Sequence, residues 1–326
     1  MQTAVWGPHV WALVHATACG VGSGMPARAP LPRAVSKMMR ALRGVLPCTF
    51  CRKSYDGFFK QLEEKAGAPF EELLCADLPR FTYDLHELVN DKLDAQRCET
   101  AMAQLGLPSR VSQALRARAM ATGAFRGRRI SFEVWQRRQQ VSPTVLSPGN
   151  VLDVLFVTAL NYPEDSDEDA AAAAIAARTP GADTMPPSNR RKLYRTWLKT
   201  LPAALRSAGM TCELPDILKY VWGACTRRVC PAPPADLPVA LLHKLKELRL
   251  QLARDGGVPR RAALFDVIFL VRAMFQDMRC LRSVSALAAA REKLQLRYEA
   301  ARVPAFRPPE GSCADGACYL TRRRLG

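Results

Sequence analysis

The chain has 326 residues, of which 48% are hydrophobic, and it carries 47 lysines and arginines against 30 acidic residues. This length allows about two domains with buried cores, and the composition excludes a chain that is disordered throughout. The net charge of +17 favours anionic partners such as nucleic acid or phosphate-bearing cofactors, unless it serves solubility alone.

The first residues lack the basic stretch, apolar stretch and cleavage site of a secretory signal, and the sequence contains no run of about 18 apolar residues. We therefore expect a protein that is neither secreted nor transmembrane and that resides in the cytoplasm. Eleven cysteines in a reducing compartment favour catalytic over structural use. Because their number is odd, at least one stays unpaired or pairs outside the chain if the others are oxidised.

The first predicted helix covers residues 6–18, with Pro8 in its first turn. Trp11 and His15 are four residues apart and therefore share a face, where they either contact an aromatic ligand or fill a core. The glycines between positions 20 and 24 follow a helical rather than a strand pattern. They do not match a dinucleotide-binding loop, and a flexible turn is predicted there.

Apolar residues at helical spacing over 35–46 lead to Pro47 and then to the pair Cys48 and Cys51, which opens an amphipathic helix ending near Lys65. Two thiols at this spacing lie within disulfide distance. The exposed N–H groups of a helix start favour the thiolate form of the first thiol. By itself the pair is also compatible with half of a zinc site or with two buried thiols.

A further helix is predicted over 81–93, with leucine and valine in a core stripe. His86 and Asn90 lie on an adjacent face, with Lys92 nearby. Buried imidazole, carboxamide and ammonium groups need hydrogen-bonding partners. The adenine, ribose and phosphates of a nucleotide would supply them.

Three motifs in order, Trp-x3-His, Leu-Pro-Cys-x-x-Cys-Arg-x-x-Tyr and His-x-x-Val-Asn-x-Lys-Leu, resemble the Erv/ALR family of flavin-dependent sulfhydryl oxidases over residues 1–100. The resemblance implies an all-α fold, a four-helix bundle plus a short fifth helix that binds FAD and usually pairs as a homodimer. It also implies an enzyme that forms disulfide bonds in protein dithiol substrates. Electrons would pass through the cysteine pair to FAD and then to O2, giving H2O2.

The resemblance assigns roles to single positions and implies no metal. Cys51 matches the cysteine beside the flavin ring, and Cys48 matches the outer cysteine that exchanges with incoming thiols. The positions that match the FAD-lining residues of the family are Trp11, His15, Tyr55, His86, Asn90 and Lys92.

Two features depart from the family. Glu87 stands where the family most often has asparagine, and no cysteine follows Cys98 at the spacing of a structural disulfide that many members have. Cys98 is therefore expected to be free or bonded to Cys75 or Cys19.

Residues 101–143 are predicted to connect two domains. Between positions 110 and 138 they contain eight arginines and one acid, Glu133, interleaved with Phe125, Phe132 and Trp135. This segment is either a solvated basic face or a surface for nucleic acid or another anionic partner. The alternative to an oxidase is accordingly a basic helical interaction or nucleic-acid-binding protein whose cysteine pair is structural.

Residues 144–302 are predicted to form a second all-α domain of unassigned function. Helices are expected over 151–160, 190–205, 214–225 and 237–253, and one or two over 262–301, with an acidic, alanine-rich surface loop over 164–174. An Erv/ALR unit followed by a helical extension resembles the sulfhydryl oxidases of large nucleocytoplasmic DNA viruses. That resemblance would place the protein in host cytoplasm, virus factory or virion.

The tail, residues 303–326, is predicted to be flexible and carries Cys313 and Cys318. In several Erv/ALR members a cysteine pair on a mobile terminus shuttles electrons from substrate to the proximal pair, so these two are the shuttle candidates; an exposed disulfide or two idle thiols is the alternative. The remaining cysteines are expected to be structural or buried: Cys212, Cys225, Cys230 and Cys280.

Overall fold

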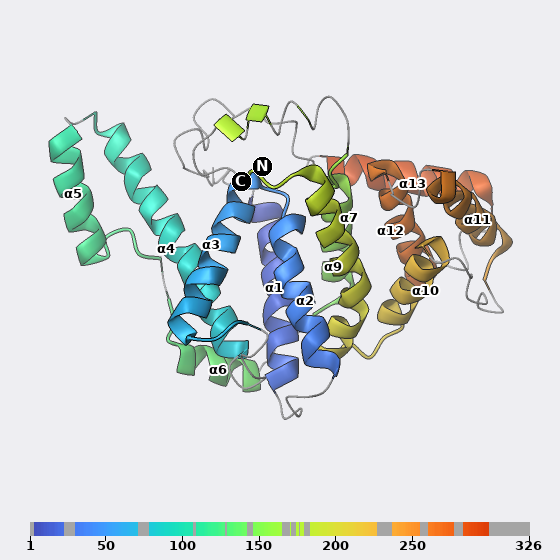
Figure 1. Ribbon diagram of the computed structural model, residues 1–326, viewed down its shortest axis with the longest axis horizontal. Coiled ribbons are helices and arrows are strands. Elements are labelled where there is room, and N and C mark those ends of the chain that lie inside the picture. Colours follow the sequence, from blue (N-terminus) through green and yellow to red (C-terminus); the bar gives the residue numbers. More distant parts are fainter. Residues whose placement is uncertain are drawn as a thin grey trace, which may run out of the picture.

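The computed structural model describes residues 3–22, 30–70, 78–106, 109–127, 129–141, 146–164, 170, 174–175, 177–178, 183–226, 237–254, 260–276 and 283–299. Within these ranges the chain is mainly helical and has no strand, which confirms the all-α prediction (Figure 1). Five of the cysteines discussed above lie outside the described residues, together with most of the acidic insert: Cys75, Cys230, Cys280, Cys313 and Cys318.

The first four helices are α1 (Thr3–Gly22), α2 (Pro30–Val45), α3 (Thr49–Ala66) and α4 (Leu78–Gln104). Helix α1 packs against α2 and α4, and α3 also packs against α2 and α4, so the four surround a common interior. Leu13, Met38, Leu42 and Leu85 are completely buried there. The helices predicted over 6–18, 35–46 and 81–93 are present, and each is longer than the sequence pattern indicates.

Helices α5 (Ser109–Thr122) and α6 (Phe132–Val141) fall in the predicted connecting segment. Helix α5 packs against the far end of α4 and projects away from the rest of the chain (Figure 1). Among its described residues none is buried. Helix α6 also contacts α4, and its Trp135 is buried.

The remaining helices are α7 (Pro148–Leu160), α9 (Pro187–Ser207), α10 (Leu214–Thr226), α11 (Val239–Arg254), α12 (Arg261–Gln276) and α13 (Val284–Glu299). They confirm the helices expected over 144–302, with two helices in its last part. Helices α2 and α9 pack along each other, and α1 contacts both α7 and α9. Buried residues from Trp6 to Tyr298 consequently belong to one hydrophobic cluster. The predicted division into domains stays a prediction.

Two local predictions for α1 are wrong. The helix begins at Thr3, so Pro8 lies inside it rather than in its first turn. An interior proline removes one backbone hydrogen bond, and the buried side chains of Trp6 and Val10 on either side offset that loss. The helix also continues through Gly20 to Gly22, where the sequence predicts a turn. Gly20 packs closely against Ser207 at the end of α9.

Candidate active site

A cavity of about 450 Å³ lies between α1, α3 and α4. It is lined by aromatic and aliphatic side chains together with a few polar ones: Trp6, Gly7, Pro8, Val10, Trp11, Val14, Leu46, Cys51, Ser54, Tyr55, Phe58, His86, Val89, Asn90, Lys92, Leu93 and Gln96. The volume lies within the range of about 300 to 1,000 Å³ that is usual for small-molecule sites. Of the six predicted cofactor-binding residues, the cavity brings together all but His15.

The two cysteines of the pair occupy different positions. Cys51 lines the cavity, whereas Cys48 does not. Cys48 is the N-cap of α3, and its Sγ accepts a hydrogen bond from the Cys51 N–H at 3.3 Å. A sulfur in this position occupies the place that Ser, Thr or Asp usually takes, where the positive end of the helix dipole stabilises negative charge. Cys48 is only 9% exposed.

His15 lies behind His86, away from the cavity. The two imidazoles are hydrogen-bonded through His15 Nε2 and His86 Nδ1 at 3.0 Å. His86 stacks on Trp11 with ring centroids 4.0 Å apart, and His15 contacts Trp135 of α6 at 5.1 Å. Burial, with a smaller effect of His86, lowers the pKa of His15 to about 3, and burial lowers the pKa of His86 to about 4. Both rings are therefore neutral at neutral pH.

The hydrogen bonding of this pair assigns its tautomers. The His15 Nδ1 atom is buried and has no hydrogen-bond partner among the described residues. An N–H group left in that position costs more than an unused lone pair. The proton of His15 therefore resides on Nε2 and is donated to His86 Nδ1, which leaves His86 with its own proton on Nε2.

The other polar groups of the cavity are mostly donors. Lys92 Nζ donates to Ser54 Oγ at 2.6 Å, and Asn90 Nδ2 donates to Glu87 Oε1 at 2.8 Å. The Trp6 Nε1–H is buried and has no partner among the described residues. The Tyr55 hydroxyl instead donates to the Met39 carbonyl on α2 at 2.9 Å, and burial raises the Tyr55 pKa well above its usual range. Tyr55 therefore contributes its ring to the cavity wall and stays protonated.

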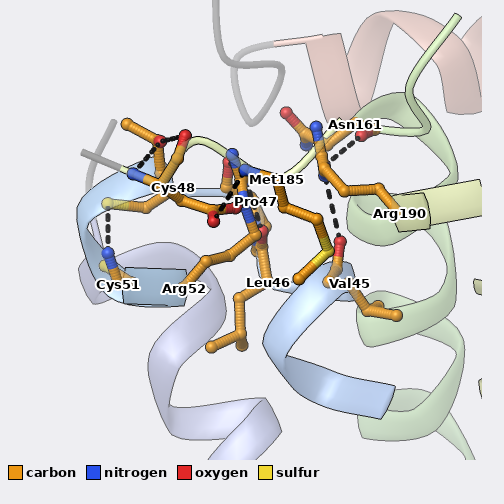
Figure 2. A network of polar contacts seen from close by, with 12 residues as sticks. Val45, Leu46, Pro47, Cys48, Cys51, Arg52, Asn161, Met185 and Arg190 are labelled. Atoms are coloured by element: carbon orange, nitrogen blue, oxygen red, sulfur yellow. Dashed lines mark hydrogen bonds and ion pairs between the residues drawn. The ribbon is translucent and has the colours of Figure 1, made fainter. Parts of the chain in front are cut away.

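The turn that precedes the cysteine pair is fixed by a buried arginine (Figure 2). Arg52, 7% exposed, donates from Nη1 to the carbonyls of Leu46 and Pro47 at 2.9 and 3.1 Å. Its Nε pairs with Asp183 Oδ2 at 2.7 Å. The Asp183 N–H in turn donates to Thr49 Oγ1 at 3.0 Å, so the chain just before α9 lies against the start of α3.

Helix α9 holds the end of α2 from the other side. Arg190 Nε donates to the Gly44 carbonyl at 3.2 Å and its Nη2 to the Asn161 carbonyl at 3.3 Å. The Tyr194 hydroxyl lies 3.1 Å from the Val45 carbonyl. The position of the dithiol thus depends on residues more than 130 positions away in the sequence.

Sequence reasoning missed Trp6, Ser54, Arg52 and Trp135 as parts of this site or its supports. Arg52 directly follows Cys51 in the motif, and that adjacency was the one available signal. Trp135 was assigned to the basic connecting segment, yet its ring packs beside His15. In the same segment Arg129 faces inward, where Glu87, Asp91 and Asp94 pair with it.

The other described cysteines lie away from the cavity. Cys98 is fully buried in α4 as a thiol, so it is not bonded to Cys19, and the pKa of Cys19 is raised to about 11 by burial. Cys225 is buried and Cys212 is half-buried. The predicted partner Cys75 and the shuttle candidates lie outside the described residues.

Comparisons with known proteins return no match: no family model, no curated protein and no solved structure aligns with this chain. Within the described ranges, no group of three or more His, Cys, Asp and Glu side chains is arranged to hold a metal ion. In the same ranges no helix combines the length and the apolar character that crossing a bilayer requires.

Proposed function

We propose that this chain is an FAD-dependent thiol oxidase of the Erv/ALR type that introduces disulfide bonds into dithiol proteins. One observation carries the proposal. Cys51 shares a cavity with five side chains that the family resemblance assigns to flavin binding: Trp11, Tyr55, His86, Asn90 and Lys92. They come from three helices, and α1 and α4 are separated in the sequence by two others.

The residues present fit FAD. The walls supply aromatic and aliphatic surface for a flat ring, and Lys92 and the Asn90 amide bring hydrogen-bond donors that suit the acceptor-rich ring and phosphates of a flavin dinucleotide. The Trp6 ring lines the cavity, and its buried Nε1–H has no partner among the described residues. When bound, FAD would accept an electron pair from the dithiol and transfer it to O2.

The two cysteines divide the work of the protein itself. A substrate thiolate attacks Cys48 in the Cys48–Cys51 disulfide, which forms a mixed disulfide with Cys48 and releases Cys51. The second substrate thiol then attacks the substrate sulfur of that mixed disulfide, which forms the substrate disulfide and releases Cys48. The Cys48–Cys51 pair is thereby reduced to two thiols. Cys51, facing the cavity, then gives up the electron pair as the intramolecular disulfide reforms. Two electrons and two protons leave the substrate and reduce O2 to H2O2.

The test uses the purified full-length chain. We expect flavin absorbance, and oxygen consumption that depends on an added dithiol. Cys48→Ser and Cys51→Ser should reduce that consumption to the level without enzyme while the circular dichroism spectrum stays helical. Cys212→Ser, a half-buried cysteine outside the cavity, is the matched control and should retain wild-type activity.

Two results would overturn the proposal. One is a purified protein that binds no FAD after incubation with added cofactor. The other is a Cys51→Ser variant with wild-type oxygen consumption. The proposed partners are dithiol proteins, O2 and a second copy of the chain. Cys313 and Cys318 remain the shuttle candidates.

A further inference from the structure

A second hollow of about 450 Å³ lies between α9 and α10 and shares no lining residue with the cavity of Cys51. Small residues, Pro202, Ala203 and Gly223, form part of its lining. The half-buried indole of Trp222 borders it. The hollow therefore presents an aromatic ring at a site that small side chains leave open.

The helix beside this hollow is strongly basic. Helix α9 carries six lysines and arginines and no acidic residue. Lys192, Arg195, Lys199 and Arg206 follow one another at intervals of three, four and seven residues, so they share one helix face. With a rise of 1.5 Å per residue this cationic stripe is about 21 Å long, and its last two members line the hollow.

The charge inside the hollow is not balanced. Lys199 of α9 and Lys219 of α10 both line it, and neither forms an ion pair with a described residue. The single acid of the lining, Asp216, is already paired with Arg206. Two exposed lysines consequently line the hollow without a carboxylate of their own, and their charge favours an anionic ligand.

An aromatic ring beside a row of cations is the arrangement that binds single strands. Cations follow the phosphates, and the ring stacks on a base, which every nucleotide offers once it is not paired in a duplex. We propose that the α9–α10 hollow binds single-stranded nucleic acid, with phosphates along the cationic stripe and a base against Trp222. An acidic peptide would use the cations but would have no need of the ring.

The experiment measures binding of the full-length protein to fluorescently labelled oligothymidine by anisotropy at several salt concentrations. The logarithm of the binding constant falls as the logarithm of the salt concentration rises. Each lost phosphate contact should make this negative slope less steep by about 0.7 for a single strand. Lys199→Gln and Lys219→Gln should each reduce the steepness of the salt dependence by this amount. Lys246→Gln, an exposed lysine of α11 outside the hollow, has the same charge change and should leave the slope unchanged.

The role of the ring is tested separately. Trp222→Leu should weaken oligothymidine binding about tenfold with the salt slope unchanged, while Trp222→Phe, which keeps a ring, should retain most of the affinity. An abasic oligomer with the same number of phosphates should bind the unaltered protein about tenfold more weakly. This last measurement requires no variant to fold.

Three results would overturn the proposal. The first is an equal effect of Lys246→Gln and Lys199→Gln, which would mean that net charge rather than the hollow attracts the strand. The second is equal binding of abasic and normal oligomers. The third is displacement of the oligomer by polyaspartate as efficiently as by unlabelled oligothymidine, which would favour an acidic peptide. None of these outcomes depends on flavin or on thiol oxidation.

Discussion

The paired imidazoles of His15 and His86 are the most sharply defined polar contact beside the cavity. Their hydrogen bond and the buried, unused Nδ1 of His15 place the His86 proton on Nε2. Since that ring lines the cavity, His86 offers a donor to whatever binds there. His15 acts through His86, as a residue that fixes its tautomer.

We predict that two-bond proton–nitrogen spectra show His86 as the Nε2–H tautomer, still neutral at a pH midway between about 4 and 6.5. In His15→Phe the donor is lost, and His86 should become a mixture of tautomers. An Nδ1–H tautomer in the unaltered protein would contradict the assignment.

The same pair makes stability depend on pH, and the sign follows from its lowered pKa values. Below pH 6.5 the unfolded chain binds protons on both imidazoles, whereas the folded chain does so only near pH 4 and 3. The contribution of the two histidines to the free energy of unfolding should therefore be fully present above pH 6.5. It should decrease as the pH falls from 6.5 toward 4 and 3. In His15→Phe the fall should be smaller.

The site was predictable from sequence only where short motifs carry it. The motifs containing Trp11, Cys51 and His86 indicate that these residues contribute to one site, and all three line the cavity. It could not place Trp135 or Asp183, because each reaches the site through tertiary packing from a distant segment. His15 was assigned to the cofactor along with Trp11, and one more turn of helix was enough to put it behind His86.

At the scale of elements, the contact between α1 and α9 depends on a glycine. A Cβ added at Gly20 would lie 1.8 Å from the Ser207 carbonyl oxygen and 2.7 Å from its carbonyl carbon. Both are backbone atoms, so neither can rotate aside. The glycines from 20 to 24 suggested a turn from composition alone, whereas Gly20 serves close approach of two helices.

We predict that Gly20→Ala lowers the free energy of unfolding by about 1–3 kcal/mol, the usual cost of an overpacked contact. Gly57→Ala is the matched control, because a Cβ there meets nothing within 4 Å in the middle of α3. It should raise the free energy of unfolding by about 0.5–1 kcal/mol, since alanine loses less entropy in a helix. Urea unfolding followed by circular dichroism measures both, and equal effects of the two substitutions would contradict the close contact.

At the scale of the whole molecule, one cluster of buried residues connects the first four helices, α1 to α4, with the helices that follow residue 144. The predicted boundary after residue 100 falls inside α4, which ends at Gln104. Helix α2 packs along α9, and residues of both halves belong to one hydrophobic cluster. Composition marks residues 101–143 as a basic connection, but it carries no information on which helix faces meet.

We therefore predict that residues 1–141 produced alone do not form the native bundle. The fragment lacks α9, so the apolar face of α2 is open to water, Arg52 loses Asp183, and the carbonyls of Gly44 and Val45 lose Arg190 and Tyr194. Arg52 would then be a buried charge without its carboxylate, which is costly. We expect a helical fragment with little near-ultraviolet circular dichroism, dye binding to exposed apolar surface and no bound flavin. The full chain, by contrast, should unfold in one transition.

A fragment that folds cooperatively and binds FAD would instead support two independent domains with a boundary near residue 100. It would leave the thiol oxidase proposal intact while removing α9 from the support of the dithiol.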